Sequence, residues 1–196
     1  MLTTIAASLL ALIAPQDALS DCAGIADPAA RLACYDRPSD ETVPVPNTST
    51  SYRRGQWLVA SSVDPDTGTP TVGLAVVADQ SSTRENPPTL LFRCVGGTLD
   101  TLIDWDTSIR RDGDETVVTT QIDAQRPEAI EWRVSADGTA TYAPVGREYA
   151  FLSGLYFAQR LVARVTPEDE PVRTAGFNVS GLLDVAPALW DTCPPR

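Results

Sequence analysis

Two pairs of carboxylates are the groups best suited to chemistry in this sequence of 196 residues, and they lie in Asp104-Trp105-Asp106 and Asp112-Gly113-Asp114. Two carboxylates about 5 to 10 Å apart can act as general acid and base on a glycoside, and an acidic loop can bind calcium. Neither segment has the ligand order or the closing Glu of a calcium-binding loop. Asp and Gly also form turns readily, so we interpret both segments as turns on an acidic surface.

This chain lacks the basic side chains that activate a catalytic nucleophile. The sequence contains no His, and all 15 of its basic residues are Arg. A catalytic Ser needs a neighbouring base such as His or Lys, and Schiff-base chemistry needs Lys. The sequence also lacks the Gly-x-Ser-x-Gly turn of the α/β-hydrolases. We therefore expect no catalytic activity, no cofactor and no metal.

The charge of the chain favours a binding function directed at proteins. Its 26 acidic residues outnumber the 15 Arg and give a formal charge of −11, which argues against nucleic acid as a partner. Arg and aromatic residues are enriched in protein interfaces. Trp105 lies between two Asp and is expected near the surface, so we predict a contact surface formed by Asp104, Trp105, Asp106, Arg110 and Arg111. By contrast, Trp57 and Trp132 lie in alternating segments and are expected in the core.

Four cysteines indicate structural disulfides. Cys22 and Cys34 lie 12 positions apart, whereas Cys94 and Cys193 are distant in the sequence. Four cysteines allow three pairings, and proximity favours Cys22–Cys34 together with Cys94–Cys193. No Cys-x-x-Cys or other zinc-binding spacing is present.

The N-terminus resembles a secretory signal peptide. Residues 5–14 form an apolar run that is too short to span a bilayer. Small residues at Ala18-Leu19-Ser20 then suggest cleavage after Ser20. A lipid anchor on Cys22 is disfavoured because Asp21 precedes it, and a buried N-terminal helix is the structural alternative. We expect a periplasmic protein with an oxidised cysteine set and no membrane span in its mature form.

The remainder of the sequence divides into three parts. Residues 21–36 form a disulfide-clipped segment in which Asp27 caps a short helix that begins at Pro28. Residues 37–54 are rich in Pro, Ser and Thr and are interpreted as a linker. Residues 55–196 form the main domain. Alternating apolar residues between turn motifs predict strands there, at Trp57–Val63, Thr71–Ala78, Thr89–Val95, Leu99–Trp105, Glu115–Ile122, Ile130–Val134, Thr139–Tyr142, Val162–Val165 and Val172–Phe177.

Short helices complete the expected main domain. Residues 146–161 have helical spacing, although Gly154 weakens it. Residues 180–190 predict a second helix whose regular part starts near Asp184, because Pro187 is tolerated only in a first turn. The fold class is therefore mostly β: an antiparallel β-sandwich with short helices near the C-terminus and a small clipped N-terminal helical segment.

Several stretches of the chain resemble one known family. They are Cys22 with Arg31–Asp36, Gly55–Trp57, Ser61–Asp64, Leu91–Cys94, Leu161–Pro167, Phe177–Leu182 and Cys193. As an ordered set they resemble the TagO (VasI-like) family of type VI secretion system-associated proteins. The resemblance implies an exported, β-rich accessory protein that binds a protein partner in the cell envelope or secretion machine, and it brings no catalytic residues.

Two alternative hypotheses remain open at the level of sequence. One is a periplasmic glycan- or peptidoglycan-binding β-domain, or a weak glycosidase, that uses Asp104, Trp105 and Asp106. The other is a generic exported domain that shares only the cysteine scaffold of the family.

Overall fold

The computed structural model describes residues 26–29, 31, 49–64, 67–82, 86–109, 114–168 and 170–194. The chain divides into two units, residues 1–39 and 40–196. In the first unit, Pro28, Ala29 and Arg31 are helical, and Oδ1 of Asp27 accepts a hydrogen bond from the Ala29 N–H at 2.9 Å. Asp27 thus caps the turn as the sequence predicts. The expected signal peptide, Cys22 and Cys34 lie outside the described residues.

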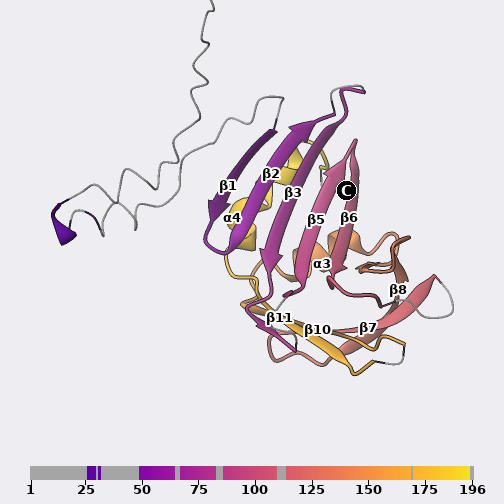
Figure 1. Cartoon of the computed structure of the whole chain (residues 1–196). Coiled ribbons are helices and arrows are strands. Elements are labelled where there is room, and N and C mark those ends of the chain that lie inside the picture. The colour runs from indigo at the N-terminus through magenta and orange to yellow at the C-terminus, as the bar shows by residue number, and fades with distance from the viewer. Residues whose placement is uncertain are drawn as a thin grey trace, which may run out of the picture. The chain divides into compact units, whose positions relative to one another are not determined.

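The second unit is built on one antiparallel sheet, and Figure 1 shows its strands β1, β2, β3, β5 and β6 side by side. The described strands are β1 (Ser49–Arg54), β2 (Trp57–Val63), β3 (Pro70–Val77), β4 (Gln80–Ser81), β5 (Thr89–Val95), β6 (Thr98–Asp104), β7 (Glu115–Ile122), β8 (Glu128–Val134), β9 (Ala140–Tyr142), β10 (Arg160–Val165) and β11 (Arg173–Asn178). Their order across the sheet is β1-β2-β3-β5-β6-β9-β8-β7-β10-β11-β4. The prediction of a mostly antiparallel β fold is confirmed.

The strand predictions fail mainly at one boundary. Three predicted strands, β2, β5 and β7, have the predicted bounds, and six others differ by one or two residues at their ends. The predicted linker at residues 37–54, however, contains β1, which pairs with β2 along its whole length from Ser49↔Ser62 to Arg54↔Trp57. The first strand of the sheet therefore begins at Ser49, before the predicted domain boundary at residue 55. The two-residue strand β4 was also not predicted.

The connectivity of the sheet differs from that of a sandwich made of two separate sheets. All eleven strands belong to one hydrogen-bonded sheet. Its last strand, β4, follows β3 after only two residues, Ala78 and Asp79, and pairs with β11. The Asp79 N–H donates to the Gly176 carbonyl at 3.1 Å, and the Ser82 N–H donates to Thr174 at 2.9 Å. The sheet therefore curls until β11 meets the continuation of β3, as the right-handed twist of strands permits.

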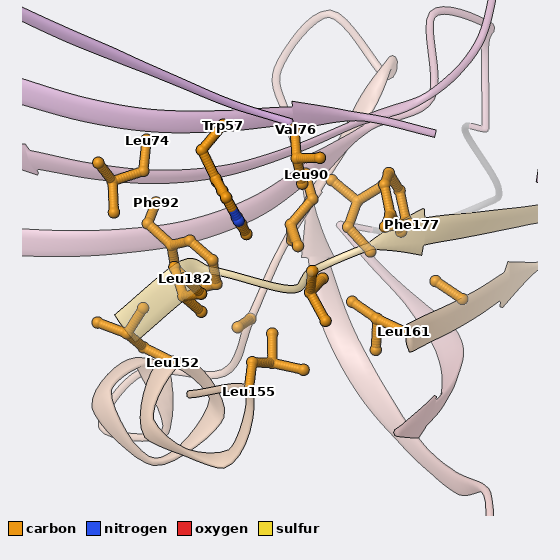
Figure 2. Close-up of a cluster of buried hydrophobic side chains, with 14 of the residues drawn as sticks. Trp57, Leu74, Val76, Leu90, Phe92, Leu152, Leu155, Leu161, Phe177 and Leu182 are labelled. Carbon is orange, nitrogen blue, oxygen red and sulfur yellow. The ribbon is translucent and has the colours of Figure 1, made fainter. Parts of the chain in front are cut away.

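The core fills the inside of this curl. Alternate residues of β2, β3 and β5 turn Trp57, Leu74 and Phe92 inward, and each is fully buried. Figure 2 shows these side chains facing Leu161 and Phe177 from β10 and β11. Leu152, Leu155 and Leu182, from the helical segments, close the cluster. Trp57 and Trp132 are both buried, as predicted.

Three short helices are found among the described residues of the second unit, and two of them correct the prediction for the C-terminal segment. They are α3 (Glu148–Gly154), α4 (Leu182–Val185) and α5 (Pro187–Trp190). Instead of one helix with a regular part from Asp184, the tail forms two helices. Pro187 ends the pattern of α4 and occupies the first turn of α5, where its missing N–H is tolerated.

The C-terminal tail is joined covalently to the sheet. Cys94 of β5 forms a disulfide with Cys193, with their Cα atoms 5.9 Å apart, and this predicted bond is confirmed. Helix α5 contacts β3, and α4 contacts β2. Within the described part of the chain, no helix combines the length and apolar character needed to cross a bilayer.

Candidate interaction surface

The predicted contact surface at the end of β6 is not formed as expected. Trp105 is only 1% exposed, so the prediction that it lies near the surface is wrong. Its N–H donates to the Thr139 carbonyl at 2.9 Å, so pairing with the β9 side continues one residue beyond β6. Ile103 and Trp105 consequently face the same interior side of the sheet. The indole Nε1 donates to Oγ1 of buried Thr141 at 3.0 Å.

The carboxylates beside Trp105 form a turn. The Asp106 N–H donates to Oδ1 of Asp104 at 3.0 Å, and Asp106 has φ +50°. This is the local bond of an Asx turn, as the sequence indicated. Of the other predicted residues, Arg110, Arg111 and Asp112 lie outside the described residues. No cluster of three metal-ligating side chains occurs among the residues the structure describes.

A different set of polar side chains meets on the outer face of the sheet. Register places Arg93 of β5 opposite Asp100 of β6, and Tyr142 of β9 opposite Arg133 of β8. Arg93 donates to Asp100 at 3.0 Å, and the Arg133 guanidinium lies 4.5 Å from the centre of the Tyr142 ring. We call Arg93, Asp100, Arg133 and Tyr142 the Arg–Tyr row. The hydrogen bond to Asp100 raises the pKa of Arg93 above its ordinary value.

A shallow groove of about 280 Å³ adjoins this row. It crosses the outer face of β1, β2, β3 and β5, and Arg93 belongs to both features. It is lined mainly by small residues, namely Ser49, Thr50, Ser51, Ala60, Ser61, Ser62, Thr71 and Gly73, with Leu91. The hydroxyls of Thr50 and Ser61, which are paired across β1 and β2, lie 2.7 Å apart on the other face of the sheet, because Ser61 alternates with Ala60 and Ser62. The groove exists because β1, β2 and β3 carry mostly small residues where they line it.

Strand β1 is the edge strand of the sheet among the described residues, and it lies beside the groove. It pairs with β2 on one side, and no described strand lies on its other side. Five of its six residues are exposed, including Arg53 and Arg54. Natural proteins commonly shield sheet edges with Pro, Lys, bulges or a covering element. The register of β1 with β2 is continuous, with no bulge.

Reasoning from sequence missed these features for specific reasons. The composition of residues 37–54 concealed β1, although Thr50 and Tyr52 alternate just before Gly55, which turns at φ +60°. The Arg–Tyr row joins four strands whose pairing the sequence does not specify. Comparison with known proteins finds no matching family model, no matching curated protein and no matching solved structure. Function is therefore inferred from this surface and from the resemblance described above.

Proposed function

We propose that this chain is an exported, non-catalytic accessory protein that binds a protein partner in the cell envelope, in association with a type VI secretion system. The free, exposed edge of β1 is the observation that supports a protein partner. The ordered resemblance to the TagO (VasI-like) family supports the secretion system. All basic side chains of the chain are Arg. Arg suits contacts with protein because its guanidinium group binds carboxylates in a bidentate manner.

Strand addition is the binding mode that the edge of β1 offers. An extended segment of the partner would pair with the backbone of β1 and extend the sheet. Alternate side chains of that segment would then project over the groove, which supplies space and hydroxyl groups. Arg53 and Arg54 would favour a partner segment with acidic residues near one end.

Two neighbouring proline substitutions test this binding mode. N–H groups alternate in direction along a strand, so Ser51→Pro and Tyr52→Pro each remove one N–H, one directed toward β2 and one toward the free edge. The variant that loses the N–H directed away from β2 should keep its thermal stability and lose partner binding in the periplasm. The variant that loses the N–H directed toward β2 should have a lower thermal stability, because a hydrogen bond between β1 and β2 is removed. A photocrosslinker at Thr50 would identify the partner, and a crosslinker on the distant β8 residue Glu131 is the control.

Failure of this proposal is equally measurable. If both proline variants retain full crosslinking to the partner, β1 is not the docking edge. If the crosslinked proteins and the neighbouring genes include no secretion-system or envelope component, the association with a type VI system is wrong.

The Arg–Tyr row favours a second candidate, a glycan- or peptidoglycan-binding surface. The row combines a tyrosine ring, two Arg and one Asp beside a groove that carries Ser and Thr hydroxyls. It replaces Trp105 as the aromatic platform, because buried Trp105 cannot stack on a sugar. Arg93→Ala would abolish sedimentation with peptidoglycan under this hypothesis, whereas Arg147→Ala, outside the row, would not. Unchanged sedimentation of Arg93→Ala would exclude it.

A further inference from the structure

A pocket of about 130 Å³, open to solvent, lies between the inner face of β7 and β8 and one side of α3. Alternation along β7 turns Thr120 and Ile122 toward it. Alternation along β8 turns Glu128, Ile130 and Trp132 the same way. Register joins the two sets, because Thr120 is paired with Glu128. The two strands therefore form one continuous wall of the pocket.

Helix α3 forms the opposite wall through Arg147, Ala150 and Phe151. Spacings of three and four positions place these residues on one side of a helix. The Phe151 N–H donates to the Arg147 carbonyl at 2.9 Å, so the helical geometry includes Arg147. Phe151 meets Trp132 of the other wall edge to face, with ring centres 5.6 Å apart. An aromatic pair thus joins the two walls.

The pocket is apolar at its base and charged at its rim. Trp132 and Ala143 are buried, whereas the side chains of Arg147 and Glu128 are 53% and 58% exposed. These two form an ion pair with an N–O distance of 3.2 Å. An ion pair this exposed contributes little to folding. Both charged groups therefore remain available to a bound molecule.

The chemistry of the pocket selects one class of ligand. A cavity of about 150 Å³ is known to hold one benzene ring, so the base suits a ring or a branched alkyl group. At the rim, a guanidinium group binds a carboxylate and a carboxylate binds an ammonium group. A ligand with a charge of only one sign would meet a like charge beside its partner, which disfavours it. A zwitterion with an apolar side chain matches the base and the rim together.

We propose that this pocket binds a free α-amino acid with an apolar side chain. The side chain lies against Trp132 and Phe151, the ligand carboxylate binds Arg147, and the ligand ammonium group binds Glu128. All three groups of such a ligand are attached to one carbon atom, as the adjacent base and rim require. The site is separate from the Arg–Tyr row, and the inference does not rest on the proposed function.

Isothermal titration calorimetry on the full, oxidised chain tests the ligand class. L-Phenylalanine and L-leucine are expected to bind saturably with one site per chain. L-Phenylalaninamide lacks the carboxylate and N-acetyl-L-phenylalanine lacks the ammonium group, so each should bind about ten-fold more weakly, the effect of one charge-assisted contact. L-Aspartate, whose side chain is charged, should show no binding.

Two variants assign the charged groups of the ligand to residues. Arg147→Gln should weaken L-phenylalanine about ten-fold and leave L-phenylalaninamide unaffected, because that ligand has no carboxylate to lose its partner. Glu128→Gln should likewise weaken L-phenylalanine and leave N-acetyl-L-phenylalanine unaffected. Arg164→Gln is the matched control, because Arg164 is an exposed residue of β10 outside the pocket lining. It should leave every affinity unchanged.

The outcomes are distinct. A wild-type chain that binds none of L-phenylalanine, L-leucine and L-valine at their solubility limits overturns the proposal. So do equal affinities for L-phenylalanine, its amide and its N-acetyl form, or an equal loss of affinity in Arg164→Gln. Tighter binding of glycyl-glycyl-phenylalanine or phenylalanyl-glycyl-glycine than of L-phenylalanine would assign the pocket to a peptide end and would overturn the free amino acid as its ligand.

Discussion

At the scale of single residues, two buried threonines on neighbouring strands have opposite hydrogen-bonding states. Thr141 of β9 is fully buried and accepts the hydrogen bond from the Trp105 indole. Thr101 of β6 is 1% exposed, and its hydroxyl has no partner among the described residues. A buried polar group without a partner is costly, whereas a satisfied pair is close to neutral. The two positions therefore respond differently to the same isosteric change.

We predict that Thr141→Val lowers the free energy of unfolding by about 1–3 kcal/mol, because it leaves the buried indole N–H without an acceptor. Thr101→Val is the matched control and should leave stability unchanged or raise it, since it removes an unpaired hydroxyl. Urea denaturation measures both values. Equal destabilisation by the two variants would contradict this account.

Single residues also show where sequence reasoning succeeds. Trp57 and Trp132 were predicted in the core because apolar residues alternate around them, and both are buried. The prediction that Trp105 is exposed was wrong because it relied on the polarity of its two Asp neighbours. Alternation along the strand places Asp104 on the opposite side from Trp105, and Asp106 is exposed in the turn that follows. The polarity of sequence neighbours therefore says little about which face a strand residue occupies.

At the scale of elements, the turn that leads from α3 into β10 depends on one side chain outside it. Asp123 follows β7 and caps the first N–H groups of the returning chain at Gln159 and Arg160. Its φ of +46° is tolerated better by Asn and Asp than by other residues. The carboxylate thus joins the end of one strand to the start of its neighbour.

Asp123→Ala is predicted to lower the free energy of unfolding by about 1–2 kcal/mol, because two backbone hydrogen bonds worth about 0.5–1.5 kcal/mol each are lost at an exposed site. Asp123→Asn keeps an acceptor oxygen and tolerates the same φ, so it should cost less than half as much. Thermal denaturation compares the two variants. A larger loss for Asn than for Ala would disprove the capping role.

The elements themselves were largely predictable, since nine of the described strands follow alternating patterns between turn residues. Strand β1 was not, because residues 37–54, with six Ser and Thr and three Pro, have the composition of a linker. Its hydrogen bonds with β2 stabilise it in spite of weak local propensity. The Arg–Tyr row could not be predicted either, since it depends on which strands become neighbours.

At the scale of the whole molecule, the Cys94–Cys193 disulfide closes a long loop. The two residues are 99 positions apart, and both are buried. In the chain-entropy model, a cross-link over a loop of about 100 residues stabilises the fold by about 4.7 kcal/mol. Export to an oxidising compartment would keep the bond formed.

The double variant Cys94→Ala/Cys193→Ala is expected to lose about 2–5 kcal/mol of unfolding free energy. Guanidinium denaturation of the variant, beside the wild type with and without reductant, measures the loss. Reduced wild type should match the double variant. A double variant as stable as the oxidised wild type would show that the helical tail docks without help from the bond.

The return of the sheet upon itself has a consequence for strand alignment. Because β3 runs into β4 through Ala78 and Asp79, the pairings from β3 round to β11 and β4 form a closed circuit. A slip of one pair by two residues must be cancelled by an opposite slip elsewhere in that circuit, or the Asp79–Gly176 hydrogen bond cannot form. The closed circuit as a whole thus excludes misaligned pairings, because the register of each strand pair restricts the register of all the others.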